Sequence, residues 1–83
     1  MPKYMDHHKG TVTLPPEVAK QMVEGIKAGS KNALGVKGLN SFFAKDETWC
    51  LTEAPNADAV CKTHEGMGIK IGVGDVKEVQ TLV

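Results

Sequence analysis

The sequence predicts an α+β fold in one domain that spans residues 1–83. Three observations predict it: short β-prone runs, two segments whose apolar residues recur at helical spacing, and the order of these elements, β-α-β-β-α-β. This order is that of the ferredoxin-like βαββαβ sandwich, in which a four-stranded antiparallel sheet carries two helices on one face. Right-handed crossovers would place the first and third strands side by side in the middle of the sheet.

The first half of the chain supplies a strand and a helix. Residues 3–9 alternate weakly and end at a glycine, so we expect a strand there, followed by a connection over residues 11–14. Two prolines and a glutamate at positions 15–17 mark a helix start, because proline is tolerated in a first turn and a carboxylate suits the positive end of the helix dipole. An apolar stripe then predicts a helix over roughly residues 16–33, with Gly35 as its stop.

The second half begins with two β-prone runs, residues 38–44 and 48–53, which a short polar turn separates, so they predict a hairpin. Glycines dominate residues 64–75 and predict a loop. This loop follows a helix rather than a strand and lacks the Lys-Ser/Thr ending of a phosphate-binding loop. Residues 76–83 are the expected last strand.

A second helix is expected directly after Pro55. Asn56 can cap it, because an asparagine side chain accepts a backbone N–H that has no partner in the first helical turn. Four residues fall at the i, i+3, i+4, i+7 spacing of one helix face: Ala57, Val60, Cys61 and His64. His64 therefore lies near the far end of the helix, on the face that packs against the sheet.

Composition argues against several classes of partner. Ten basic and ten acidic residues cancel and are interspersed along the chain. We therefore expect neither nucleic-acid binding, which uses a basic stripe to release counterions, nor membrane binding, which uses a polybasic run or a long apolar segment. The first residues lack the apolar stretch of a secretory signal, so we expect a cytoplasmic protein whose two cysteines stay reduced.

The side chains that can bind metal gather at one end of the expected sheet. They are Asp6, His7, His8, Cys50, Glu53 and His64. Because the first and third strands run antiparallel and the second helix returns along the third strand, the tip of this helix should lie where the first strand ends. That position places His64 close to His7 and His8. Imidazole and thiolate groups suit nickel, copper or zinc, and the spacing does not distinguish these ions.

Only one of the two adjacent histidines can face His64, because neighbouring strand residues point to opposite faces of a sheet. We take the helix-covered face as the one with bulky apolar side chains on the central strands: Met5, Trp49 and Leu51. On this assignment His7 lies beneath the second helix with His64. His8 then shares the open face with Asp6 and Cys50, where a partner subunit can complete a second ligand set.

Each of these residues also has an ordinary structural explanation. A histidine on an apolar helix face is often a hydrogen-bonded core residue, a cysteine can be a small buried apolar residue, and Glu53 can accept N–H groups at the helix entrance. An enzyme of the small dimeric monooxygenase or isomerase type is an alternative, with His7 or His64 as general base and a carboxylate as its orienting partner. No nucleophile with an evident adjacent base favours it. A non-metal small-molecule binding module is a further alternative, for which the chain offers no ligand signature.

The face of the sheet opposite the helices would be bare in a monomer. The aromatic side chains of the strands cannot all fit beneath two short helices if polarity alternates. These are Tyr4, Trp49 and one of Phe42 and Phe43. We therefore expect a homodimer through the open sheet face, which would add burial to a domain of marginal size.

Three short stretches resemble a known family: residues 1–7, the run from Cys50 to Pro55, and Ala59-Val60 followed by His64. The family consists of small dimeric ferredoxin-like proteins, long classified as a domain of unknown function, and nickel binding has been attributed to some members. The resemblance implies this fold, a homodimer and binding of nickel or another divalent transition metal, for sequestration or sensing. The chain departs from the family pattern in the glycine-rich loop after His64 and in the glycines of its first helix.

Overall fold

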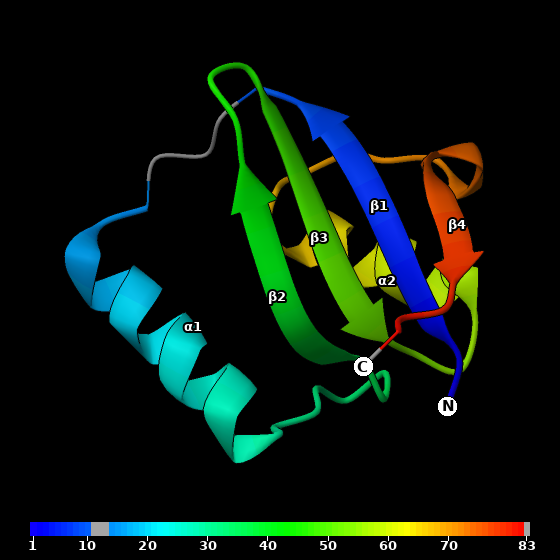
Figure 1. The fold of residues 1–83 in the computed structure, drawn as a ribbon, viewed down its shortest axis with the longest axis horizontal. Coiled ribbons are helices and arrows are strands. Elements are labelled where there is room, and N and C mark those ends of the chain that lie inside the picture. The colour runs from blue at the N-terminus through cyan, green and yellow to red at the C-terminus, as the bar shows by residue number, and fades with distance from the viewer. Residues whose placement is uncertain (11–13, 83) are drawn as a thin grey trace.

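The computed structural model describes residues 1–10 and 14–82 of the chain. In chain order its elements are β1 (Lys3–Lys9), α1 (Pro16–Ala28), β2 (Lys37–Phe43), β3 (Glu47–Glu53), α2 (Ala57–Gly66), the 3-10 turn η1 (Val73–Asp75) and β4 (Val76–Val79). The strands form one antiparallel sheet in the order β2-β3-β1-β4, with α2 behind its centre (Figure 1). The expected ferredoxin-like α+β fold is confirmed, with the first and third strands in the middle.

The limits of β1 match the expected strand, and the two hairpin strands begin and end within one residue of expectation. α2 continues to Gly66, so the glycine-rich loop begins later than predicted, and β4 already ends at Val79. The expected connection at residues 11–13 and the last residue of the expected final strand lie outside the described residues. Within residues 1–10 and 14–82, neither helix has the length and apolarity needed to cross a membrane.

α1 ends five residues earlier than the apolar stripe predicts. Gly29 adopts a left-handed conformation, with φ of 70°, directly after Ala28. Its N–H donates to the Ile26 carbonyl at 3.1 Å, and the Ser30 N–H donates to the Gly25 carbonyl at 3.0 Å. This pair of bonds is the Schellman arrangement, which satisfies the last carbonyl groups of a helix and turns the chain away from it. The expected helix over residues 16–33 with its stop at Gly35 is therefore wrong, because Gly29 already provides the stop.

Replacing Gly29 by alanine is expected to lower the free energy of unfolding by about 1 kcal/mol, because a Cβ atom is strained in the left-handed region. Urea denaturation followed by circular dichroism measures the change. Gly66→Ala is the matched control, since Gly66 lies in α2 and a Cβ added there would meet no atom within 4 Å among the described residues. An equal cost for both substitutions would contradict the assigned role of Gly29.

α2 packs small side chains against the centre of the sheet. Asn56 caps it as expected, because its side-chain oxygen accepts the Ala59 N–H at 2.9 Å. The buried residues of this helix are Ala59, Val60, Cys61 and His64. Apolar residues from the strands and connections complete the core: Tyr4, Val36, Ala54, Ile71 and Val76.

The burial pattern of β1 reverses the expected assignment of the two sheet faces. Tyr4 and Asp6 are buried on the helix-covered face, whereas Met5 and His7 alternate onto the open face and stay partly exposed. The β1–β3 register pairs Met5 with Leu51, so the bulky apolar residues of the central strands lie on the open face. The prediction that they mark the helix-covered face is wrong, because the small residues of α2 leave room beneath it for polar side chains that contact His64.

α1 lies beside the β2 edge of the sheet, whereas α2 lies over the centre (Figure 1). No residue of α1, all of which the structure describes, is buried. The helix contacts β2, where a methyl group added to Gly38 would lie 3.6 Å from Ile26. Because α1 packs loosely against the sheet, space remains between α1, α2 and the sheet.

Candidate metal centre

Four side chains with metal-binding groups converge on the helix-covered face. Asp6, His8, Cys50 and His64 each offer one donor atom, and these four atoms all lie within 4.8 Å of one another. Asp6 and Cys50 face each other across the β1–β3 ladder, and His8 lies on the same face of β1 two residues further on. His64 reaches the same point from α2, where its ring centroid lies 5.8 Å from that of His8.

One ring nitrogen of His64 is anchored so that the other faces the cluster. Nδ1 lies 2.9 Å from the Val60 carbonyl, and because a carbonyl only accepts, Nδ1 donates. Nε2 is thereby directed at the Asp6 Oδ1 atom, at 3.3 Å. Metal-binding histidines commonly hold one nitrogen in this way, which orients the second nitrogen toward the ion.

The cluster contains buried polar atoms without hydrogen-bond partners. Asp6 is fully buried, and among the described residues neither of its carboxylate oxygens has a partner with hydrogen-bond geometry. The same holds for Nε2 of His64, whose 3.3 Å contact with Asp6 is an ion-pair distance only. Most buried polar groups in proteins are satisfied. A divalent cation placed among these atoms would satisfy all three, so the residues fit a metal.

Charge interactions in the cluster shift the pKa values of its histidines. Burial lowers the pKa of His64, but its contacts with the Asp6 carboxylate, the Cys50 thiol and a backbone carbonyl outweigh burial and raise this pKa to about 10. Burial lowers the pKa of His8, and the nearby Asp6 carboxylate opposes this only in part. At neutral pH the metal-free cluster therefore holds a protonated His64 against Asp6, and a metal would displace that proton.

The metal-free protein is expected to lose stability as pH rises from neutral toward 10. Because the folded-state pKa of His64, about 10, lies above the ordinary value of 6.5, its contribution is full below pH 6.5 and disappears as pH passes through 10. Urea denaturation in the presence of a chelator at several pH values measures this fall. His64→Gln removes the titrating ring, so a pH dependence identical to that of the wild type would contradict this origin.

His7 does not belong to the cluster. It lies on the open face, where its Nε2 is 3.1 Å from the Glu47 Oε1 atom and its ring lies 5.2 Å from that of Trp49. The prediction that His7 faces His64 beneath α2 is therefore wrong, and His8 occupies that place. The reason is that the helix-covered and open faces are the reverse of those assigned from the sequence, so His8 rather than His7 lies beneath α2.

The other predicted site residues are also distributed between the two faces of the sheet. Asp6, His8 and Cys50 do share one face as predicted, but it is the helix-covered face rather than the open one. Glu53 lies three residues beyond Cys50 and opposite Lys3, so it falls on the other face and outside the cluster. One contributor was not predicted: the Ser41 hydroxyl donates to the Cys50 Sγ across 3.7 Å. The hairpin register, which pairs Ser41 with Cys50, is the signal that would have found it.

Fold and site together define a small ferredoxin-like domain with a candidate centre for a transition metal under its second helix. The chain belongs to the SCO4226-like family of nickel-responsive proteins, because the family model described as "Nickel responsive protein SCO4226-like" matches residues 4–73. The crystal structure of SCO4226 from Streptomyces coelicolor A3(2) is similar, with a TM-score of 0.67 and 25% sequence identity over 98% of this chain and 99% of that one. Comparison with curated proteins gives no match.

Proposed function

We propose that the chain binds a divalent transition metal, with nickel as the first candidate, through Asp6, His8, Cys50 and His64. The observation that carries the proposal is the convergence of these four donor atoms within 4.8 Å of one another. The unpartnered oxygens of the buried Asp6 support it, since a cation would satisfy them. Membership of a family described as nickel-responsive supports nickel among the candidate ions.

The donor set balances the charge of a divalent ion. Asp6 carries one negative charge, and Cys50 supplies a second when its thiol gives up its proton on binding. His8 and His64 would bind as neutral imidazoles. The ion and its ligands are then neutral together, which avoids the cost of burying an unpaired charge. This mixed set suits nickel, copper and zinc, and intrinsic affinity favours copper, so a preference for nickel would depend on geometry and metal supply.

Metal binding at this place would join α2 to the sheet. Asp6 and His8 belong to β1 and Cys50 to β3, whereas His64 belongs to α2. An ion held by all four would therefore stabilise the folded chain, and this stabilisation would grow with the logarithm of the free metal concentration above the dissociation constant. A buried site whose occupancy is coupled to folding suits sequestration or sensing of the metal.

The functional unit that we propose is a homodimer formed through the open sheet face. Met5, Trp49 and Leu51 lie on this face and are only partly buried in the single chain, and Phe42 beside Trp49 is 45% exposed. A second copy would remove this apolar surface from water. We also propose a cytoplasmic location, because coordination through Cys50 needs a free thiol, which a reducing compartment preserves.

Calorimetric titration of chelator-treated, reduced protein with nickel, zinc and copper tests the metal site. We expect binding in the micromolar range or tighter for wild type. His8→Ala removes a direct ligand and should weaken nickel binding by roughly 100-fold or more, at least the loss that follows from removing an outer-shell partner.

His7→Ala is the matched control, because it removes the adjacent imidazole from the opposite face of the same strand. Its nickel affinity should equal that of wild type. Equally weak nickel uptake by wild type and His8→Ala would refute the proposed site, and loss of binding in His7→Ala alone would move the site to the open face.

A further inference from the structure

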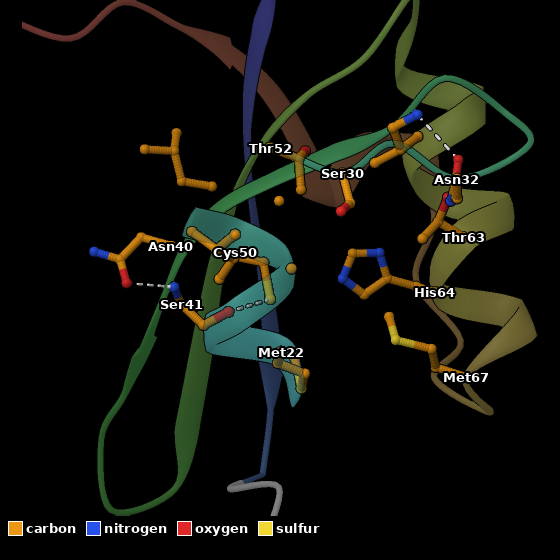
Figure 2. Close-up of a pocket in the computed structure, with 15 residues that line it drawn as sticks. Met22, Ser30, Asn32, Asn40, Ser41, Cys50, Thr52, Thr63, His64 and Met67 are labelled. Atoms are coloured by element: carbon orange, nitrogen blue, oxygen red, sulfur yellow. Dashed lines mark hydrogen bonds between the residues drawn. The ribbon is translucent and has the colours of Figure 1, made fainter. Parts of the chain in front are cut away.

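Two adjoining cavities lie between α1, α2 and the sheet, with volumes of about 220 and 250 Å³. Five residues line both: Met22, Ser41, Cys50, His64 and Met67. Figure 2 shows His64 of α2 and Met67, the residue after this helix, on the side of the cavity opposite Cys50 and Ser41 of the sheet, with Met22 contributed by α1. The metal cluster therefore forms part of the wall of this cavity pair.

The rest of the wall is mostly apolar. Side chains that contribute apolar surface are Leu14, Val18, Ile26, Val36, Phe43 and Ile69. Asn32, which borders the first cavity, uses its side chain elsewhere: its amide nitrogen donates to Thr63 at 2.9 Å and its oxygen accepts two backbone N–H groups. A ligand in the first cavity would thus meet mostly apolar walls and two residues of the cluster, Cys50 and His64.

Two features of α1 leave the two cavities unfilled by side chains. Val18 and Met22 line the second cavity, yet they remain 41% and 38% exposed, so little of the protein covers their apolar surface. Gly25 lines the first cavity, and a Cβ added there would meet no described atom within 4 Å. A glycine inside a helix costs about 1 kcal/mol relative to alanine. α1 therefore has a helix-destabilising glycine at the position where a larger side chain would fill the first cavity.

The open side of the cluster faces this cavity. Its four donors come from β1, β3 and α2, and no described residue of α1 is among them. An ion in the cluster would accordingly have no protein ligand on its α1 side. Met22 and Met67 line that side, and thioethers make favourable contacts with aromatic rings.

We propose that the first of these cavities, which Gly25 lines, binds a small organic compound with one aromatic ring, whose metal-coordinating head group reaches the ion held by the cluster. The ring fits the first cavity, whose volume is about 220 Å³, because about 150 Å³ is enough for benzene and drug-sized ligands need about 300–1,000 Å³. The proposed binding of the head group rests on the proposed metal site, whereas the proposed binding of the ring rests on the cavity alone.

Fluorobenzene tests the ring site in chelator-treated protein, which contains no metal to contribute. We expect fluorine NMR and a rise in the unfolding temperature to show binding to wild type. Gly25→Leu should abolish it by filling the first cavity, and this variant should stay folded because leucine favours helix more than glycine does. Gly66→Leu is the matched control, since Gly66 lies in α2 with no described atom within 4 Å of an added Cβ and lines neither cavity.

Benzohydroxamate and acetohydroxamate test the head group in nickel-loaded protein, because they share the coordinating group and differ in the ring. In wild type and Gly66→Leu the aromatic compound should bind more tightly by roughly ten-fold or more, and in Gly25→Leu the two should bind equally. Equal affinities in wild type, or absence of fluorobenzene binding, would overturn the proposal. If fluorobenzene binds but nickel does not, the proposed metal function is refuted, and so is the proposed coordination of the head group. The proposed binding site for the ring would still be supported.

Discussion

Asp6→Ala is expected to lower the free energy of unfolding of the metal-free protein by about 3 kcal/mol, because it removes one partner of a buried ion pair. Asp6 is fully buried, and its Oδ1 atom lies 3.3 Å from Nε2 of His64. Without the carboxylate, the His64 ring must either keep a buried charge unpaired or lose its proton. Urea denaturation in the presence of a chelator measures the loss, which is a large share of the roughly 5–15 kcal/mol that holds a typical domain together.

Asp58→Ala is the matched control for this prediction. Asp58 also pairs with a cation, at 3.1 Å from Lys62, but its side chain is 63% exposed. Exposed pairs of this kind contribute about 0.5 kcal/mol or less. Equal losses for the two alanine variants would show that burial of Asp6 adds nothing. A smaller combined cost for Asp6→Ala with His64→Leu than the sum of the single costs would show that the two residues act as a pair.

Trp49→Glu is expected to separate the proposed dimer into monomers while leaving nickel affinity unchanged. Trp49 lies on the open sheet face beside His7, on the side of the sheet opposite the cluster. Loss of a buried aromatic contact at the centre of an interface should raise the dissociation constant roughly 30-fold or more, and a buried charge adds to this. Sedimentation equilibrium measures the constant, and calorimetry measures nickel binding.

Val23→Glu is the matched control for the interface. Val23 is 48% exposed on α1, away from the open sheet face, so its substitution should leave the association unchanged. A wild-type protein that sediments as a monomer at every concentration would refute the dimer. Loss of nickel binding in Trp49→Glu would instead show that the two faces of the sheet are coupled.

Local patterns were sufficient for β1, for the two hairpin strands, and for the start and buried face of α2. Alternation and a following glycine predicted β1, and Asn56 together with the spacing of Val60, Cys61 and His64 predicted the cap and the buried face of α2. These features depend on residues a few positions apart, which is why they can be read from the chain. The end of α1 was predicted wrongly: Gly29 and Gly35 both have positive φ, but it is Gly29 that ends the helix.

The positions of the two adjacent histidines could be predicted only in part from local sequence patterns. The sequence by itself determined the element order, the strand order that follows from it, and that His7 and His8 must point to opposite faces. Only the tertiary structure decided which of them meets His64, because that depends on which face α2 covers. Alternation is symmetric between the two faces of a strand, whereas burial beneath a helix of small residues is not, and that burial brings Asp6, His8 and Cys50 to His64.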